Sequence, residues 1–316
     1  MTAAPRAPAA APLGAELHDR LRDAAERLRA AGVATPRLDA ELLLAHALQT
    51  RRERLPIDAA RSLTAAEATA FAALIARRAR REPVSHLLGR REFWSLDFAV
   101  GPAVLDPRPD SETLVETVLR RIVDRAAALS LLDLGTGSGC LILALLHELP
   151  NATGLGRDRS GDAVAVAAGN AAALGLAGRC RFEAGDWGDG LAGRFDIIVA
   201  NPPYLTRREI DETAPEVKDF EPHLALDGGI DGLDAYRRLA PEIARLLGAE
   251  GFAAVEIGQG QGDVVRALFA AAGLEARDRA ADLGGIERCL VFGHAAEAAK
   301  TGAGPQIAQQ SGRVPI

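Results

Sequence analysis

The fold of this chain is decided by residues 131–140, which read LLDLGTGSGC. A short apolar run that ends in glycines is typical of a buried strand followed by a tight turn and a helix. The spacing differs from the G-x-G-x-x-G of dinucleotide-binding loops, because the third glycine comes one residue early, before Cys140. A P-loop is excluded as well, since no Gly-Lys-Ser/Thr follows. We predict a loop that approaches a nucleoside-bearing amino-acid cofactor, with an ordinary strand–helix turn as the alternative. The residues expected to contact this cofactor are Gly135, Thr136, Gly137, Ser138 and Gly139.

Short apolar runs alternate with amphipathic segments from residue 129 to residue 293. Such alternation predicts an α/β fold in which helices cover both faces of a parallel sheet. Ligands bind these sheets at the carboxyl ends of the strands, near the switch in strand order. Strands are predicted at 129–134, 152–157, 179–184, 195–200, 251–257, 274–279 and 287–293. Helices are predicted at 139–149, 161–174, 232–247 and 261–272.

Acidic residues end the two predicted strands that follow the glycine loop. Asp158 ends the first of them, where a carboxylate can accept hydrogen bonds from both hydroxyls of a ribose. Asp186 ends the second and can accept from an adenine amino group, while Trp187 can stack on the base. A solvated carboxylate in a turn and a packed ring are the alternative interpretations. Together with the glycine loop, these residues outline a nucleoside site.

Asn201-Pro202-Pro203-Tyr204 follows the apolar run 195–200. Proline lacks an N–H group and ends a strand, so a stiff, extended loop is expected at the carboxyl edge of the sheet. The Asn oxygen and a backbone carbonyl can accept the two protons of a planar NH2 group while the Tyr ring covers its face. We therefore predict catalytic roles for Asn201, Pro202 and Tyr204, and substrate contacts for these residues and Pro203. A proline-capped strand end with a packed Tyr is the alternative.

Composition narrows the class of protein. The 316 residues carry a net charge of −6, so no overall polycation is available to grip nucleic acid. With 48% hydrophobic residues and no run of about 18 apolar residues, a globular protein is expected that neither spans nor binds a membrane. We expect a cytoplasmic monomer. The three cysteines are widely spaced and the six histidines show no paired pattern, so we expect core thiols and no metal site.

The first part of the chain predicts a small helical bundle. Residues 13–82 hold apolar residues at helical spacing, with a second helix opening at Thr35-Pro36. Thr64 and Glu67 have the spacing of a capping box for a third helix. The arginine-rich segment 77–81 at the end of that helix predicts a solvated helix face, with contact to a partner or to RNA as the alternative.

A hairpin is predicted to link the bundle to the sheet. Residues 93–100 alternate between apolar and polar side chains and predict one strand. Gly101-Pro102 predicts the turn, and residues 103–105 the returning strand. Asp110 or Ser111 is then expected to cap a helix that runs to about Arg125.

The arrangement of glycine loop, Asp158, Asp186-Trp187 and Asn-Pro-Pro-Tyr looks like a class I S-adenosylmethionine-dependent methyltransferase that acts on a planar nitrogen. Further motifs narrow the resemblance, and they occur in one order: PVSHLLG at 83–89, REFW at 91–94, PRPDSE at 107–112, DLGTGSGC at 133–140, NPPY at 201–204 and FEP at 220–222. Over about residues 15–293 the chain resembles the peptide chain release factor glutamine methyltransferases, the PrmC/HemK family. The combination of motifs is highly specific, although Asn-Pro-Pro-Tyr alone is not.

The resemblance implies a Rossmann-like class I methyltransferase sheet with an antiparallel last strand, joined by a β-hairpin to an N-terminal helical substrate-recognition domain. It implies methyl transfer from S-adenosyl-L-methionine to the glutamine amide of the Gly-Gly-Gln loop in class 1 release factors, in support of translation termination. It places the cofactor on Gly135 to Gly139, Asp158, Trp187 and Asn201, and the glutamine amide on Asn201 to Tyr204. The expected divisions are a disordered lead at 1–12, the helical domain at 13–85, the hairpin linker at 86–106, the methyltransferase domain at 107–294 and a flexible tail at 295–316.

The sequence departs from the family pattern at two places, and it leaves two alternative functions open. Gly156-Arg157 stand where small or apolar strand residues are usual, so fraying of that strand is expected, and Asp106 replaces an apolar residue.

A DNA adenine-amino methyltransferase is the alternative enzyme, because an adenine amino group is also planar. It needs base flipping and a basic recognition surface, which the net charge of −6 disfavours. A non-catalytic adaptor is the alternative from another class, and it need not bind the cofactor.

Overall fold

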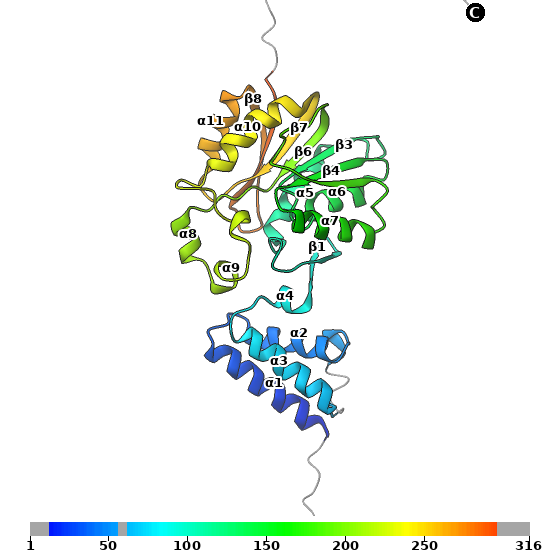
Figure 1. Cartoon of the computed structure of the whole chain (residues 1–316), viewed down its shortest axis with the longest axis vertical. Helices are drawn as coiled ribbons and strands as arrows, with labels where there is room; N and C mark the ends of the chain where they lie inside the picture. The colour runs from blue at the N-terminus through cyan, green and yellow to red at the C-terminus, as the bar shows by residue number, and fades with distance from the viewer. Residues whose placement is uncertain (1–12, 56–61, 296–316) are drawn as a thin grey trace, which may run out of the picture.

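The computed structural model describes residues 13–55 and 62–295. A helical domain lies at one end of the molecule and a domain built on a large sheet at the other (Figure 1). The expected lead at 1–12 and the tail from residue 296 lie outside the described residues. No helix among the described residues combines the length and the hydropathy needed to cross a bilayer.

The described part of the helical domain is a bundle with its own apolar core. Its core includes Leu28, Leu43 and Leu44, all fully buried. The predicted capping box is confirmed, because the Thr64 side chain accepts the Glu67 N–H and the Glu67 side chain accepts the Thr64 N–H. The elements are α1 (Leu13–Ala30), α2 (Pro36–Ala47), η1 (Arg52–Arg54), α3 (Ala65–Arg78) and α4 (Val84–Leu88).

The hairpin of the linker lies elsewhere than the sequence pattern predicts. Strand β1 (Arg90–Phe93) pairs with β2 (Leu96–Ala99). The predictions of a single strand at 93–100 and of a turn at Gly101-Pro102 were therefore wrong. The turn residues Trp94 and Ser95 both have positive φ, 54° and 57°, as a two-residue hairpin turn requires. The Trp94 N–H and indole are held by Glu112 and Glu148. Glu92 within the hairpin accepts the Ser95 N–H, so local and distant carboxylates together fix this backbone without the Asn-Gly pair that usually marks such a turn.

The sheet confirms the predicted α/β architecture. Its strand order is β5-β4-β3-β6-β7-β9-β8, and β9 runs opposite to the other six strands. The expected antiparallel last strand is therefore confirmed. The strands are β3 (Ser130–Leu134), β4 (Thr153–Asp158), β5 (Cys180–Ala184), β6 (Phe195–Ala200), β7 (Leu247–Glu256), β8 (Leu274–Ala281) and β9 (Glu287–His294).

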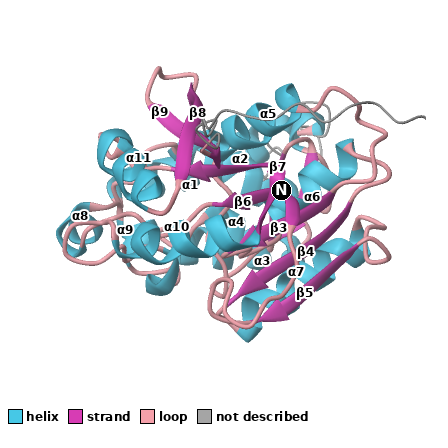
Figure 2. Cartoon of the chain, turned by 90° about the horizontal axis from the view of Figure 1, so that it is seen from above, coloured by secondary structure: helices cyan, strands magenta, loops and turns pink. Residues whose placement is uncertain are grey.

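Helices cover both faces of this sheet (Figure 2). One apolar cluster joins the sheet to the helices α5 (Glu112–Arg121), α6 (Cys140–Glu148) and α7 (Gly161–Ala173). A second joins the opposite face to α10 (Asp234–Leu246) and α11 (Gly262–Ala271). Neighbouring residues of β3 alternate between the two, with Leu131 in the first cluster and Leu132 in the second. A strand buried on both faces reads as a continuous apolar run, which is why its sequence was informative.

Strand β4 is continuous where fraying was expected. Gly156 pairs with Asp133 on one side and with Phe182 on the other. A Cβ at position 156 would lie 2.5 Å from the Phe182 ring and 2.8 Å from Thr136 Oγ1. Glycine at this position therefore allows close packing of the neighbouring side chains.

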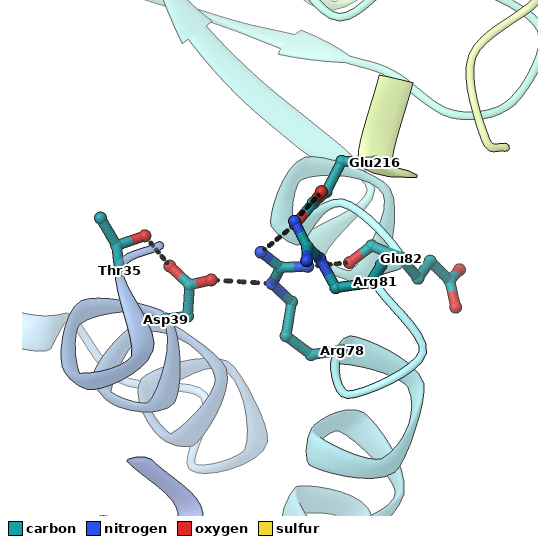
Figure 3. A network of polar contacts seen from close by, with 6 residues as sticks. All are labelled: Thr35, Asp39, Arg78, Arg81, Glu82 and Glu216. Atoms are coloured by element: carbon teal, nitrogen blue, oxygen red, sulfur yellow. Dashed lines mark hydrogen bonds and ion pairs between the residues drawn. The ribbon is translucent and has the colours of Figure 1, made fainter. Parts of the chain in front are cut away.

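An excursion between β6 and α10 connects the two domains. It carries α8 (Arg207–Glu212), α9 (Pro215–Lys218) and η4 (His223–Ala225). Glu216 on α9 accepts hydrogen bonds from Arg78 Nη2 at 2.8 Å and from Arg81 Nη2 at 2.6 Å (Figure 3). Arg78 is buried and also donates to Asp39 at 2.7 Å, so the predicted solvated face is wrong for this arginine.

We expect Glu216→Gln to lower the free energy of unfolding by about 1–3 kcal/mol, between the costs of breaking an exposed and a buried ion pair. Burial favours the neutral carboxyl, but the hydrogen bonds from Arg81 and Arg78 outweigh it and lower the pKa of Glu216. Urea unfolding measures the change. Glu212→Gln on α8 is the matched control, because its pair with Arg208 is exposed. Equal stability of the two variants would show that the contact does not hold the domains.

Candidate active site

The carboxyl ends of β3, β4, β5 and β6 surround a cavity of about 310 Å³. This volume lies within the range of small-molecule sites. The structure brings most of the predicted site residues to its wall: Gly135, Thr136, Gly137, Ser138, Asp158, Asp186, Trp187, Asn201 and Pro203. Gly139, Pro202 and Tyr204 are not among the lining residues.

The glycine loop has the backbone that its sequence predicts. Gly135, Gly137 and Gly139 all have positive φ, between 54° and 81°. A Cβ on Gly135 would lie 3.2 Å from the Trp187 ring. A Cβ on Gly139 would instead lie 3.1 Å from Leu143 in α6, so this glycine serves the packing of the helix. Gly135 and Gly137 thus present backbone without a Cβ to the cavity, next to Thr136 and Ser138.

Asp158 ties the glycine loop to the end of β4. Its Oδ2 accepts the Gly137 N–H at 2.9 Å, and its Oδ1 accepts the Ser160 N–H at 2.9 Å. An ionised carboxylate has about four acceptor sites, so two remain for a ligand. The residue is therefore both a fixed part of the loop and a free acceptor at the cavity wall.

Asp186 and Trp187 lie together at the end of β5, as predicted. The ring of Trp187 lies beside Gly135, and its backbone has a positive φ of 48°. Asp186 Oδ2 accepts from Arg238 Nη2 at 2.9 Å, and Arg238 also lines the cavity. Sequence reasoning missed Arg238, because it lies on α10, far along the chain from the strand ends.

The Asn-Pro-Pro-Tyr loop divides its side chains between the cavity and the protein interior. Asn201 lines the cavity, and its Nδ2 donates to Ser111 Oγ at 3.1 Å. The Tyr204 ring packs against the core shared with β7, and its hydroxyl lies 3.4 Å from Glu256 Oε1. Burial raises the pKa of Tyr204 above its usual range. The prediction that Tyr204 covers a ligand therefore lacks the geometry in this structure.

Ser111 and Glu256 are site residues that sequence reasoning did not assign. Ser111 was expected as a helix cap, but its side chain makes no capping hydrogen bond and lines the cavity instead. Glu256 ends the apolar strand β7, the same signal that pointed to Asp158 on β4. The sequence analysis used this signal for Asp158 and Asp186, but its predicted strand 251–257 ran one residue past Glu256.

Two buried carboxyls lie beneath the site. Asp133 is fully buried, accepts from Thr136 Oγ1 at 2.7 Å, and its Oδ1 has no partner among the described residues. Burial raises the pKa of Asp133 to about 7. Burial likewise raises the pKa of Glu256 to about 7. Both groups thus prefer the neutral form far more than an exposed carboxyl does.

Comparison with known proteins identifies the two domains. The family described as the PrmC N-terminal domain matches residues 19–89, and a methyltransferase domain matches residues 126–259. A release factor glutamine methyltransferase of Rhodospirillum rubrum is 50% identical over 285 residues, which cover 90% of this chain and 87% of that protein. One of Caulobacter vibrioides is 49% identical over 251 residues, covering 79% of this chain and 86% of that protein. The chain belongs to the release factor glutamine methyltransferase family.

Membership of this family confirms the resemblance drawn from the motifs and the expectation of a methyltransferase. A solved protein-(glutamine-N5) methyltransferase of Alicyclobacillus acidocaldarius is also similar, with 29% identity over 62% of this chain and 98% of that chain and a TM-score of 0.36. In this chain, the glycine loop and two residues of the Asn-Pro-Pro-Tyr loop, Asn201 and Pro203, line one cavity.

We expect Asp133→Asn to make stability less dependent on pH. Because the pKa of Asp133 rises to about 7 on folding, the folded chain holds a proton that the unfolded chain releases above pH about 4. This contribution to stability is present at low pH and is lost as the pH rises toward 7. Each pKa unit corresponds to about 1.4 kcal/mol, so the difference is on the order of a few kcal/mol.

Urea unfolding of Asp133→Asn and the original chain at pH 5 and pH 8 measures this loss. Asparagine retains an acceptor for Thr136, so the fold is expected to survive. Glu275→Gln, at an exposed position of β8, is the control and should follow the original chain. A decline between pH 5 and pH 8 that Asp133→Asn leaves unchanged would contradict the prediction.

Proposed function

We propose that this chain transfers a methyl group from S-adenosyl-L-methionine to the side-chain amide nitrogen of a glutamine in the Gly-Gly-Gln loop of class 1 peptide chain release factors. The observation that carries the proposal is the placement of Asn201 on the same cavity as the glycine loop and Asp158. The names of the relatives support glutamine as the substrate residue and release factors as the substrate proteins.

The residues present fit the cofactor. Gly135 and Gly137 both have positive φ, and a Cβ on Gly135 would lie 3.2 Å from the Trp187 ring. Without a Cβ, this backbone leaves room for a ligand to approach it closely. The free acceptor sites of Asp158 suit the ribose hydroxyls, and the Trp187 ring suits a stacked base. Asp186 is the proposed acceptor for the adenine amino group, with Arg238 holding its carboxylate in place. The cofactor, when bound, supplies a methyl group on a positively charged sulfur.

Asn201 is the proposed acceptor for one N–H of the substrate amide. Its Nδ2 is used by Ser111, which leaves Oδ1 free to accept a hydrogen bond. The Pro202 carbonyl is the proposed acceptor for the other N–H. An amide nitrogen is a poor nucleophile, because its lone pair is delocalised into the carbonyl. Two fixed acceptors would orient that lone pair and stabilise positive charge as it forms on nitrogen, and the proton then leaves to water.

The remaining parts of the loop would hold the substrate side chain in line. Pro203 lines the cavity and stiffens the loop. Tyr204 is proposed to anchor the loop from behind through its contacts with the β7 core, and to reach the amide plane only with substrate bound. Alignment of reacting groups can supply up to about 7–11 kcal/mol of the barrier. Positioning is therefore the main contribution that we propose for this loop.

The helical domain is the proposed docking surface for the release factor. The hydrogen bond from Arg78 to Glu216 on α9 places this domain next to the segment that follows the Asn-Pro-Pro-Tyr loop (Figure 1). Monomeric state, cytoplasmic location and the absence of direct nucleic-acid binding remain predictions from the sequence.

Incubation with tritiated S-adenosyl-L-methionine and a class 1 release factor tests the function. We expect label in the release factor, and none in a version whose Gly-Gly-Gln glutamine is changed to alanine. Label in the altered version would place the methyl group on another residue. Absence of label in both, with cofactor binding measured by calorimetry, would contradict the proposed substrate.

We expect Asn201→Ala to lower turnover at least a hundredfold while cofactor affinity changes less than threefold, because the variant loses an acceptor that acts on the developing charge. The labelled transfer assay gives turnover, and calorimetry gives affinity. Near-normal turnover would show that Asn201 does not hold the reacting amide.

We expect Gly135→Ala to weaken cofactor binding at least tenfold. The added Cβ would meet the Trp187 ring at 3.2 Å on a backbone whose φ is +81°. Gly178→Ala is the matched control, since its Cβ would meet nothing within 4 Å. Calorimetry measures both, and equal affinities would rule out the glycine loop as the cofactor cradle.

A further inference from the structure

Asn201 and Glu256 leave two adjacent strands side by side. Strands β6 and β7 are parallel, and Ala200 is the register partner of Val255. The next residues along the chain are Asn201, directly after β6, and Glu256, the last residue of β7. Asn201 lines the cavity, whereas Glu256 is only 2% exposed and lies behind it. A buried acid thus stands next to the proposed catalytic amide without contacting the cavity.

Ser111 lies between these two residues. Its Oγ accepts the Asn201 Nδ2–H at 3.1 Å. The Ser111 hydroxyl also lies near enough to the Glu256 carboxyl to lower the pKa of that acid, but the hydrogen bond that the structure gives to this carboxyl comes from the Tyr204 hydroxyl, to Oε1 at 3.4 Å. Ser111 is 2% exposed, so water does not compete freely for its hydroxyl. Glu256 Oε2 has no hydrogen-bond partner among the described residues, which leaves an acceptor for this hydroxyl.

The direction of these contacts follows from the chemistry of the three groups. An ionised carboxylate only accepts hydrogen bonds, so Glu256 Oε2 can be satisfied by Ser111 only if the Ser111 O–H donates to it. The Ser111 oxygen then offers only lone pairs to Asn201, which turns the NH2 group of that amide toward Ser111 and its Oδ1 toward the cavity. We propose that Glu256, acting through Ser111, sets the orientation of the Asn201 carboxamide and so provides the acceptor for the substrate amide. This inference rests on the proposed function, and it makes Ser111 and Glu256 positioning residues.

Protonation of Glu256 would reverse the chain of hydrogen bonds. A neutral carboxyl can donate to Ser111, whose hydroxyl can then donate to Asn201 Oδ1 and turn the Asn201 NH2 group toward the substrate. The NH2 group of Asn201 and that of the substrate amide would then face each other, and neither could accept a hydrogen bond from the other. Burial raises the pKa of Glu256 to about 7, against the opposing contact from Ser111. The active orientation is therefore present above pH about 7 and is lost below it.

Other charged and titratable groups surround the same carboxyl. The nearby cation Arg288 is held by ion pairs to Asp282 and Asp110, so it does not neutralise Glu256 by a direct hydrogen bond. Tyr236 binds the backbone carbonyl of Glu256 at 3.1 Å rather than its carboxyl. The groups that face the carboxyl are Arg288, Asp110, Tyr204, Tyr236, Cys140 and Cys289.

The test is the pH dependence of kcat in the release factor assay. We expect kcat of the original chain to rise through pH about 7 to a plateau. Ser111→Ala and Glu256→Gln should each lower the plateau about tenfold, as expected for the loss of one orienting hydrogen bond, and should remove the rise near pH 7. Ser111→Thr keeps a hydroxyl and should retain the rise and at least half of the plateau.

The double variant distinguishes a relay from two separate effects. Groups that act as a unit are not additive, so Ser111→Ala with Glu256→Gln should lose no more than either change alone. Tyr236→Phe is the matched control, because its hydroxyl contacts the same residue only at the backbone. It should keep the rise near pH 7. Melting temperatures and cofactor affinities of all variants exclude unfolding and loss of cofactor as the cause.

Clear outcomes overturn the inference. It fails if Ser111→Ala keeps the rise near pH 7, or if the double variant loses the product of the two single losses. If Glu256→Gln does not fold, the contrast between Ser111→Ala and Ser111→Thr decides alone. Unaltered kcat in every variant, with methylation by the original chain intact, sinks the inference but leaves the proposed function standing. No methylation by the original chain at any pH overturns both.

Discussion

The parallel register of β4, β3, β6 and β7 is the constraint on which the site depends. Leu134 is level with Arg157 on one side and with Ala200 on the other, and Ala200 is level with Val255. The residues that follow these positions therefore lie at the same edge of the sheet. Two apolar clusters hold the strands in this register from opposite faces, which is how an apolar core fixes the geometry of a polar site. A shift of one residue on any strand would turn its side chains to the opposite faces of the sheet and displace its site residue.

Much of this fold could be predicted because its signals are local. Apolar runs fix the strands, amphipathic segments fix the helices, and Thr64 with Glu67 marks a helix start within a few residues. The failures came from contacts between distant residues. Trp94 in the hairpin turn is held by Glu112 and Glu148, which lie outside the hairpin, so the hairpin sequence does not show these contacts. Likewise, Arg78 is buried because its partners come from other helices.

The candidate site shows the same division. The residues found from sequence end their strands or lie in the glycine loop, where a motif names them directly. The sequence analysis missed Arg238, Ser111 and Glu256. Arg238 and Ser111 lie on helical segments that reach the cavity only in the folded chain. Gly139 shows the opposite case, because its motif position suggests a ligand contact while its surroundings require it for helix packing. Sequence thus located the strand ends, whereas orientation and side-chain direction needed the packed structure.

The double contact made by Glu216 has a consequence for how the two domains move. The excursion that carries Glu216 begins immediately after the Asn-Pro-Pro-Tyr loop and ends at α10, whose Arg238 holds Asp186. Rotation of the helical bundle would either break both guanidinium contacts or pull on this excursion. The orientation of the bundle and the position of the segment that borders the cavity are therefore linked through the ion pairs of one carboxylate.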